Sequence, residues 1–151
     1  MPPELTVFLV AMSPIVELRG AIPLALGVYH LPLYQAYFLA VTGNLIPLIL
    51  IVLFARPVAD FLGKQCFILK SFMDWFFERV REKTRKLNRL GKTLTVVVLT
   101  ALPIPFVGGW TGALAAFILE LPLKRAIPSL TLGVLISGLI VSLISLGILT
   151  I

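Results

Sequence analysis

The stretch Glu17-Leu18-Arg19-Gly20-Ala21-Ile22-Pro23 places two opposite charges, two residues apart, inside a strongly apolar part of the chain. Residues 5–16 before it and residues 20–55 after its arginine contain no Asp, Glu, Lys or Arg. A charge in such surroundings is costly unless it is paired or hydrated. Gly20, Pro14 and Pro23 argue against an uninterrupted helix. The stretch therefore predicts a polar group held inside an apolar protein, at a break between helices.

Composition and charge distribution indicate an integral membrane protein. The chain has 151 residues, of which 59% are hydrophobic, and its mean hydropathy is +1.05. Soluble domains have an apolar share nearer ~45–50%. The formal net charge is +6, and residues 56–92 carry ten of the thirteen Lys and Arg with four of the seven Asp and Glu. This clustering is typical of a cytoplasmic loop and argues against a nucleic-acid partner.

The residues offer little material for catalysis. His30 and Cys66 are the only His and Cys, so neither an internal disulfide nor a Cys/His zinc site can form. There is no P-loop, no GxSxG, no HExxH and no paired-carboxylate spacing. We therefore expect no enzyme, no metal and no cofactor.

The first half predicts a re-entrant hairpin followed by one span. Residues 5–16 and 21–33 are each too short to cross a bilayer, which takes about 20 residues. We expect a helix–loop–helix that turns near Glu17–Gly20 and leaves on the side where it entered, with one kinked span over residues 5–33 as the alternative. Residues 34–55 are uncharged and predict a spanning helix. Asn44, near its middle, is better explained by helix contact than by substrate binding.

Residues 56–93 predict a basic amphipathic helix that lies along the membrane surface. The alternative is that this segment is a cytosolic connector that packs on the helical bundle. Gly91 predicts where this helix ends. The apolar residues that recur at helical spacing are Leu69, Phe72, Met73, Phe76, Val80 and Leu87.

The second half repeats the pattern of the first. Residues 94–119 are uncharged but interrupted by Pro103, Pro105 and the glycines around Trp110, and residues 127–151 form a second clear span. Ser129, Gly133 and Ser137 fall at four-residue intervals, which allows close helix approach within the fold or in a homodimer.

Two offsets align the halves. An offset of 89 residues lays Pro14-Ile15 on Pro103-Ile104 and Gly20 on Gly109, and an offset of 90 lays Leu31-Pro32-Leu33 on Leu121-Pro122-Leu123. We therefore predict an all-α integral membrane protein with one membrane domain, residues 1–151. It is an inverted repeat of re-entrant hairpin plus transmembrane helix, with repeats over about 1–55 and 94–151 and an amphipathic connector over 56–93.

This arrangement predicts an orientation in the cell membrane. Residues 56–93 and 120–126 would share one face and together hold twelve of the thirteen Lys and Arg. The positive-inside rule places that face in the cytoplasm and both termini outside.

Glu17 and Arg19 are the strongest candidates for a site. A carboxylate inside a membrane can bind and release a proton, and the planar Arg donors pair bidentately with anionic oxygens. The plainer alternative is that the two residues neutralise each other or the broken helix ends. The facing loop contributes backbone amides and the Trp110 ring. The candidate substrate-binding residues are Glu17, Arg19, Gly20, Pro23, Pro103, Pro105, Gly108, Gly109, Trp110, Thr111 and Gly112.

The string from Pro14 to Pro23, with Trp110-Thr111-Gly112-Ala113-Leu114, resembles the putative small multidrug export proteins. The resemblance extends distantly to the DedA/VTT superfamily, and it implies opposed re-entrant loops and transport or flipping of lipid-linked phosphates. The family often has Pro-x-Pro-Gly-Thr-Gly before the Trp, where this chain has Phe106-Val107-Gly108.

The function predicted from these features is ion-coupled export by a small multi-pass transporter that binds its substrate where the two loops meet. Its expected partners are membrane lipids, an unidentified small or lipid substrate, and protons or another coupling ion. A DedA-like lipid flippase or scramblase, acting on polyprenyl phosphate or phospholipid, is the first alternative. A non-transporting membrane scaffold is the second.

Overall fold

The computed structural model describes residues 1–86, 88–105 and 107–150, and over these residues it forms helices and no β-strand. Leu87 and Phe106 lie outside the described residues, and so does the side chain of Val80. The fold class predicted from the sequence, all-α, is confirmed. The helices are α1 (Pro3–Met12), α2 (Glu17–Gly27), α3 (Leu33–Gln65), α4 (Phe67–Thr84), α5 (Arg89–Ala101), α6 (Gly109–Ile118) and α7 (Leu123–Leu149).

Proline positions decide where the first helix of each half ends. Ser13, before Pro14, is extended at φ −67° and ψ 134°, and Leu102, before Pro103, is extended at φ −74° and ψ 116°. A proline disfavours helical backbone at the residue before it. Helix α1 therefore ends at Met12 and α5 at Ala101.

The turn between α1 and α2 lies at residues 13–16, so the prediction of a turn near Glu17–Gly20 is wrong by about four residues. Gly20 and Pro23 lie inside α2 instead. A proline there removes one backbone hydrogen bond, which a helix supported by neighbouring helices tolerates.

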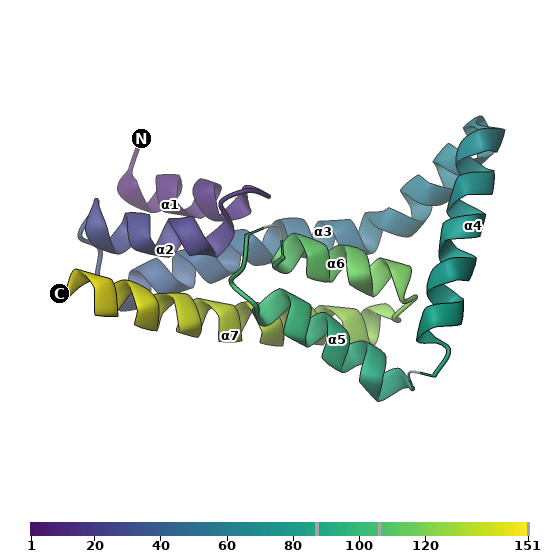
Figure 1. The fold of residues 1–151 in the computed structure, drawn as a ribbon. Coiled ribbons are helices and arrows are strands. Elements are labelled where there is room, and N and C mark those ends of the chain that lie inside the picture. The colour runs from purple at the N-terminus through teal and green to yellow at the C-terminus, as the bar shows by residue number, and fades with distance from the viewer. Residues whose placement is uncertain (87, 106, 151) are drawn as a thin grey trace.

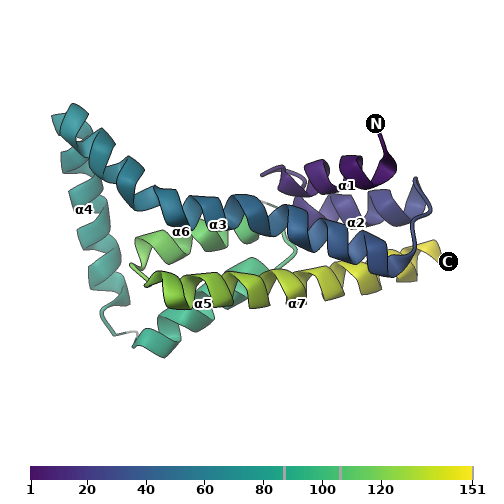
Figure 2. The ribbon, with the colours of Figure 1, turned by 180° about the vertical axis from the view of Figure 1, so that it is seen from behind.

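The four short helices form two hairpins that point toward each other (Figure 1). Helix α1 packs beside α2, and α5 packs beside α6. The turns of the two hairpins meet near the middle of the long axis, while α3 and α7 run antiparallel along the molecule, as the view from behind also shows (Figure 2). The molecule thus has two hairpins end to end beside two long helices.

The junctions that lead into the long helices have matching geometry. His30 and Glu120 both adopt the left-handed conformation, with φ values of 51° and 55°. The next amide then folds back, because Leu31 N donates to Ala25 O at 2.9 Å and Leu121 N donates to Ala116 O at 3.0 Å. Pro32 and Pro122 precede the first residues of α3 and α7 in the same extended conformation. The two halves therefore share their order of helices and their junction geometry.

The segment 56–93 is divided among three helices. Helix α3 continues through Pro57 to Gln65, α4 follows, and α5 begins at Arg89. The predicted helix end at Gly91 is wrong, because Gly91 lies in the first turn of α5 and its amide donates to the N-cap Asn88 side chain at 2.7 Å.

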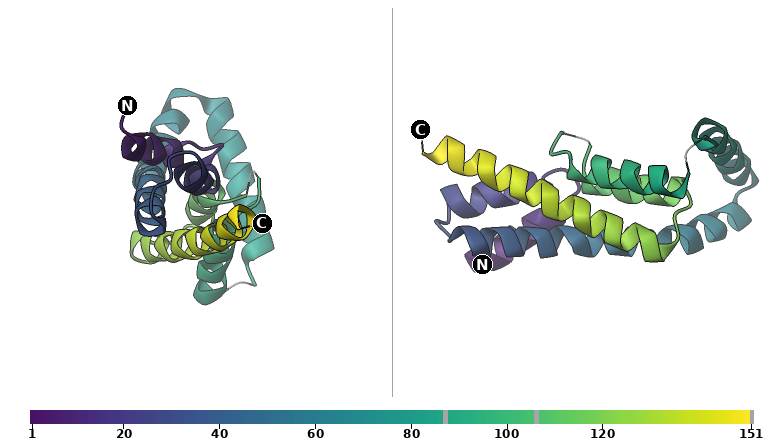
Figure 3. Two further views of the ribbon diagram at one scale, coloured as in Figure 1. Left: turned by 90° about the vertical axis from the view of Figure 1, so that its left-hand side faces the viewer. Right: turned by 90° about the horizontal axis from the view of Figure 1, so that it is seen from below.

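Helix α4 lies across the long axis of the other helices (Figure 1). It contacts α6 through an edge-to-face pair between Phe77 and Phe117, with ring centroids 5.4 Å apart. Both chain termini lie at the opposite end of the molecule (Figure 3). The basic segment and the termini are therefore separated by the length of the bundle.

In the described part of the chain, two helices, α3 with 33 residues and α7 with 27, are long and apolar enough to cross a membrane. They pack together through small residues. The Tyr37 hydroxyl on α3 donates to Leu135 O on α7 at 3.0 Å. The Tyr37 ring packs against Gly138 of α7, where a Cβ would lie 2.8 Å from the ring. Many large apolar side chains elsewhere on the long helices are exposed, such as Phe38 at 71% and Leu143 at 71%.

Candidate functional site

Glu17 reaches from one hairpin to the other. It is the first residue of α2, and only 5% of it is exposed. Its Oε2 accepts from Gly109 N at 3.4 Å, and its Oε1 accepts from Trp110 N at 3.3 Å. Both amides belong to the first turn of α6. The carboxylate therefore joins the two halves of the chain near the centre of the molecule.

The electrostatics of this contact are favourable. The first amides of a helix have no partner within the helix, and its N-terminus carries about +0.5 elementary charge. A carboxylate there contributes roughly 0.3–1 kcal/mol, up to about 2 kcal/mol when partly buried. Both distances are longer than the usual ~2.7–3.2 Å for an N–H···O bond. The carboxylate thus holds the helix end loosely.

The backbone at Glu17 is strained. Its φ of 51° is in the left-handed region, which costs a non-glycine residue on the order of 1–3 kcal/mol. The amide of Glu17 donates to Ser13 O at 3.0 Å, which closes the turn. Strain of this kind persists where the surrounding contacts hold the residue in place.

Gly108 and Gly109 allow the carboxylate and its neighbours to approach the backbone of α6. A Cβ at Gly108 would lie 2.5 Å from Glu17 Oε2. A Cβ at Gly109 would lie 2.7 Å from a methyl of Leu48 and 3.3 Å from Asn44 Nδ2. A side chain at either position would force these groups apart.

Arg19 belongs to a different part of the site. Both it and Glu17 are described, and no ion pair joins them: Glu17 contacts the amides of α6 instead. Its Nη2 donates to Ile15 O at 3.2 Å, and its Nε is buried without a partner. Arg19 lines one cavity of about 260 Å³ against α7 and another of about 330 Å³ beside the α1–α2 turn.

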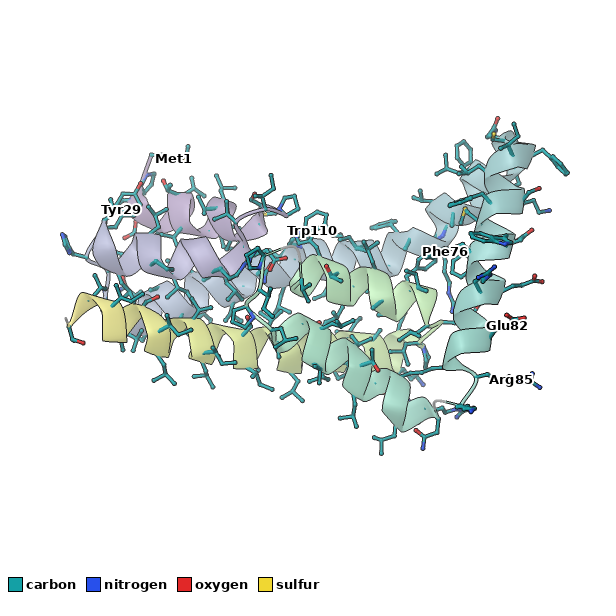
Figure 4. The ribbon with its side chains drawn as sticks, in the orientation of Figure 1. Met1, Tyr29, Phe76, Glu82, Arg85 and Trp110 are labelled. Carbon is teal, nitrogen blue, oxygen red and sulfur yellow. The ribbon has the colours of Figure 1, made fainter. Side chains whose placement is uncertain are left out.

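The predicted site residues separate into three groups. Glu17, Gly108, Gly109 and Trp110 meet at the start of α6, where Trp110 lies near the middle of the long axis (Figure 4). Arg19 lines its cavities with Pro23 and Pro103 in one and with Gly20 and Pro105 in the other. Thr111 and Gly112 lie further along α6, and Gly112 packs against Thr100 of α5.

Two parts of the site carry little or no signal in the sequence. Asn44 of α3 is 1% exposed, lies beside Gly109, and its Oδ1 is buried without a partner. Its position in the middle of an apolar span was the available signal. Five residues of α7 line the Arg19 cavity, and nothing in their sequence marks them: Val141, Ile144, Ser145, Ile148 and Leu149.

Over the described residues the chain is helical, with two apolar helices long enough to span a membrane and a carboxylate held between two short hairpins, a combination typical of a membrane protein. The family described as "Putative small multi-drug export protein" matches residues 17–140, and the chain belongs to this family. No curated protein and no solved structure matches the chain.

Proposed function

We propose that this protein is a small multi-pass transporter that exports a small or amphipathic substrate in exchange for protons or another ion. The family supports an export function in general terms. The contact between Glu17 and the first amides of α6 carries the proposal, because it joins the two halves through one titratable group.

The proposed membrane arrangement follows from helix lengths. Helices α1, α2, α5 and α6 have 10, 11, 13 and 10 residues, or about 15–20 Å at 1.5 Å per residue. The hydrocarbon core is about 30 Å thick. Each hairpin thus enters and leaves on one side, and α3 and α7 cross. The second half is then inverted relative to the first, as in many transporters.

Glu17 couples ion movement to a change between the halves. When the carboxylate takes up a proton, it loses its charge and with it most of its attraction for the N-terminus of α6. The two turns can then separate and expose the space between them to the other side. Loss of the proton restores the contact.

Transport by purified protein in proteoliposomes with an imposed pH gradient tests this function. The probes are ethidium, an amphipathic cation, and 1-anilinonaphthalene-8-sulfonate, an amphipathic anion. We expect gradient-driven movement of one probe above that of protein-free liposomes, and loss of coupling in Glu17→Gln. Full coupled transport by Glu17→Gln, or no movement of either probe, contradicts the proposal.

A lipid flippase or scramblase of DedA-like type is the second candidate. The cavity beside Arg19 supports it, since the lining residues Ile144 and Ile148 are 53% and 68% exposed on the outer surface. Movement of a fluorescent phospholipid between leaflets without any gradient, lost in Arg19→Ala, would favour this candidate over coupled export.

A further inference from the structure

Arg19 lines an apolar cavity, and its guanidinium makes one hydrogen bond, to Ile15 O. The cavity has a volume of about 260 Å³ and lies between α2, Pro103 and the last turns of α7. The α7 residues on its wall are Val141, Ile144, Ser145, Ile148 and Leu149. Apart from Arg19, the Ser145 hydroxyl is the main polar group on this wall.

Among the described residues, Arg19 makes no ion pair with a carboxylate. One hydrogen bond, from Nη2 to Ile15 O, serves a group that has five N–H donors, and the buried Nε has no acceptor. The carboxylate nearest in sequence, Glu17, is bound to α6. In the described part of the chain, no Asp or Glu lines either cavity beside Arg19. Arg19 is half-buried, and its Nε is buried without an acceptor, so an anionic oxygen would satisfy this side chain.

The cavity opens toward the outer surface of the helices. Ile144 and Ile148 line it and are 53% and 68% exposed, whereas Ser145 between them is 4% exposed. The volume is near the lower end of the ~300–1,000 Å³ typical of ligand pockets. It has room for a head group and a short apolar segment, and a longer tail would continue outward past Ile148.

We propose that this cavity binds an amphipathic anion, with a carboxylate or phosphate head on Arg19 and an apolar tail along α7. The inference rests on the proposed transport function and names the charge class of its substrate. The substrate then sits against Arg19 and α7, while Glu17 stays with α6 and serves the coupling ion.

Binding in nanodiscs of neutral phosphatidylcholine tests this inference without any gradient or transport. The probe is 11-(dansylamino)undecanoic acid, whose emission rises in an apolar site. We expect dodecyl phosphate and dodecanoate to displace it, and dodecanol, dodecyltrimethylammonium and inorganic phosphate to fail. Equal displacement by dodecanol or dodecyltrimethylammonium would overturn the proposal.

The variants follow from the geometry. Arg19→Gln is expected to weaken probe binding by about ten- to a hundredfold, the worth of a hydrogen bond to a charged group. Arg19→Lys keeps the charge and should retain part of the affinity. Arg56→Gln removes an exposed arginine outside this cavity and should change affinity by less than about twofold. Unchanged binding by folded Arg19→Gln would overturn the proposal.

A neighbouring pair of substitutions gives a second test that leaves Arg19 in place. Ile144→Phe adds bulk at the cavity mouth and should weaken binding several-fold, whereas Leu143→Phe, on an exposed residue that does not line the cavity, should not. Equal effects of the two would contradict the placement of the tail.

Phosphatidic acid in the disc distinguishes a membrane lipid from a free amphiphile as the source of the anion. If phosphatidic acid competes with the probe, the anion is a membrane lipid. If phosphatidic acid does not compete but dodecyl phosphate does, the anion is a small amphiphile. Because this assay needs no ion coupling, anion binding without gradient-driven transport would refute the exporter alone. Coupled transport with Arg19-independent binding would refute the inference alone.

Discussion

At the scale of single residues, the Glu17 carboxylate lies so close to Gly108 that a side chain at position 108 would collide with it. A Cβ at position 108 would lie 2.5 Å from Oε2 and 3.2 Å from the carboxyl carbon of Glu17. The backbone of Gly108 is extended, so space and not conformation is what requires a glycine here.

We predict that Gly108→Ala destabilises the protein by about 1–3 kcal/mol, the usual cost of forcing extra atoms into a filled site. The measurement is reversible unfolding in detergent. Gly63→Ala is the matched control, because its Cβ would meet nothing closer than 3.7 Å. A cost no larger than that of the control would show that the carboxylate can move aside freely.

A double-mutant cycle tests the pair itself. Glu17→Ala removes the carboxylate with which a Cβ at position 108 would collide. The cost of Gly108→Ala should therefore fall, with a coupling of about 0.5–3 kcal/mol for groups in contact. Equal costs of Gly108→Ala in the two backgrounds would show that the cost does not arise from contact with Glu17.

Sequence reasoning singled out Glu17 and Arg19 because charges are rare in apolar stretches, and it expected a facing loop with backbone amides and Trp110. It did not separate the surroundings of the two side chains. It placed a break at residues 17–20, where the two side chains could meet. Helix α2 begins at Glu17 instead. Residues two apart on a helix do not face each other, so one side chain reaches α6 and the other faces α7.

At the scale of helices, contacts between α5, α6 and α7 centre on Thr100. A Cβ at Gly133 would lie 2.5 Å from Thr100 Cβ and 3.0 Å from the carbonyl oxygen of Val97, and Gly112 packs on the same threonine from α6. Small residues of this kind let membrane helices approach closely.

We predict that Gly133→Ala separates α7 from α5 and lowers stability by about 1–3 kcal/mol. A backbone carbonyl cannot rotate away, so Thr100→Ser should restore only part of the loss. Gly147→Ala on the same helix, where a Cβ would meet nothing within 4 Å, should be neutral or slightly stabilising. Thermal unfolding of the three variants compares them directly, and a neutral Gly133→Ala would contradict the close contact.

The helices themselves were largely predictable, since proline positions and uncharged runs mark them. The four-residue spacing of Ser129, Gly133 and Ser137 indicated a packing face, but its partner α5 could not be chosen from sequence. Helix α3 runs ten residues past Ala55, because helix neighbours and tertiary contacts can override the tendency of Pro57 to end a helix.

At the scale of the whole molecule, α4 lies across the bundle at the end opposite the termini. Trp75 of α4 is 53% exposed, and Arg79 lies 5.3 Å from its ring centroid. An aromatic residue beside a cation suits the boundary between lipid and water.

The two tryptophans of the chain should therefore report different depths. We predict that Trp75, alone in a Trp110→Phe variant, is quenched most by phosphatidylcholine brominated near the head group. Trp110, alone in Trp75→Phe, should be quenched more by bromine near the chain ends. Stronger shallow than deep quenching of Trp110 would contradict hairpin turns at mid-membrane.

The exposed thiol of Cys66, between α3 and α4, tests orientation. We predict that a membrane-impermeant maleimide labels it only after cells are lysed, because the basic end should face the cytoplasm. Glu4→Cys in a Cys66→Ser background should be labelled in intact cells. Labelling of Cys66 in intact cells would reverse the orientation.

The matched junctions at His30 and Glu120 contrast with the unequal contact at the turns. Equivalent halves would offer two equivalent contacts across their boundary, yet one half supplies an acid and the other supplies bare amides. The first half therefore supplies the hydrogen-bond acceptor and the second half supplies the donors. Exchanging residues between the two halves should be tolerated at the junctions. At the turns the same exchange should abolish the contact between the halves, because there one half accepts and the other donates.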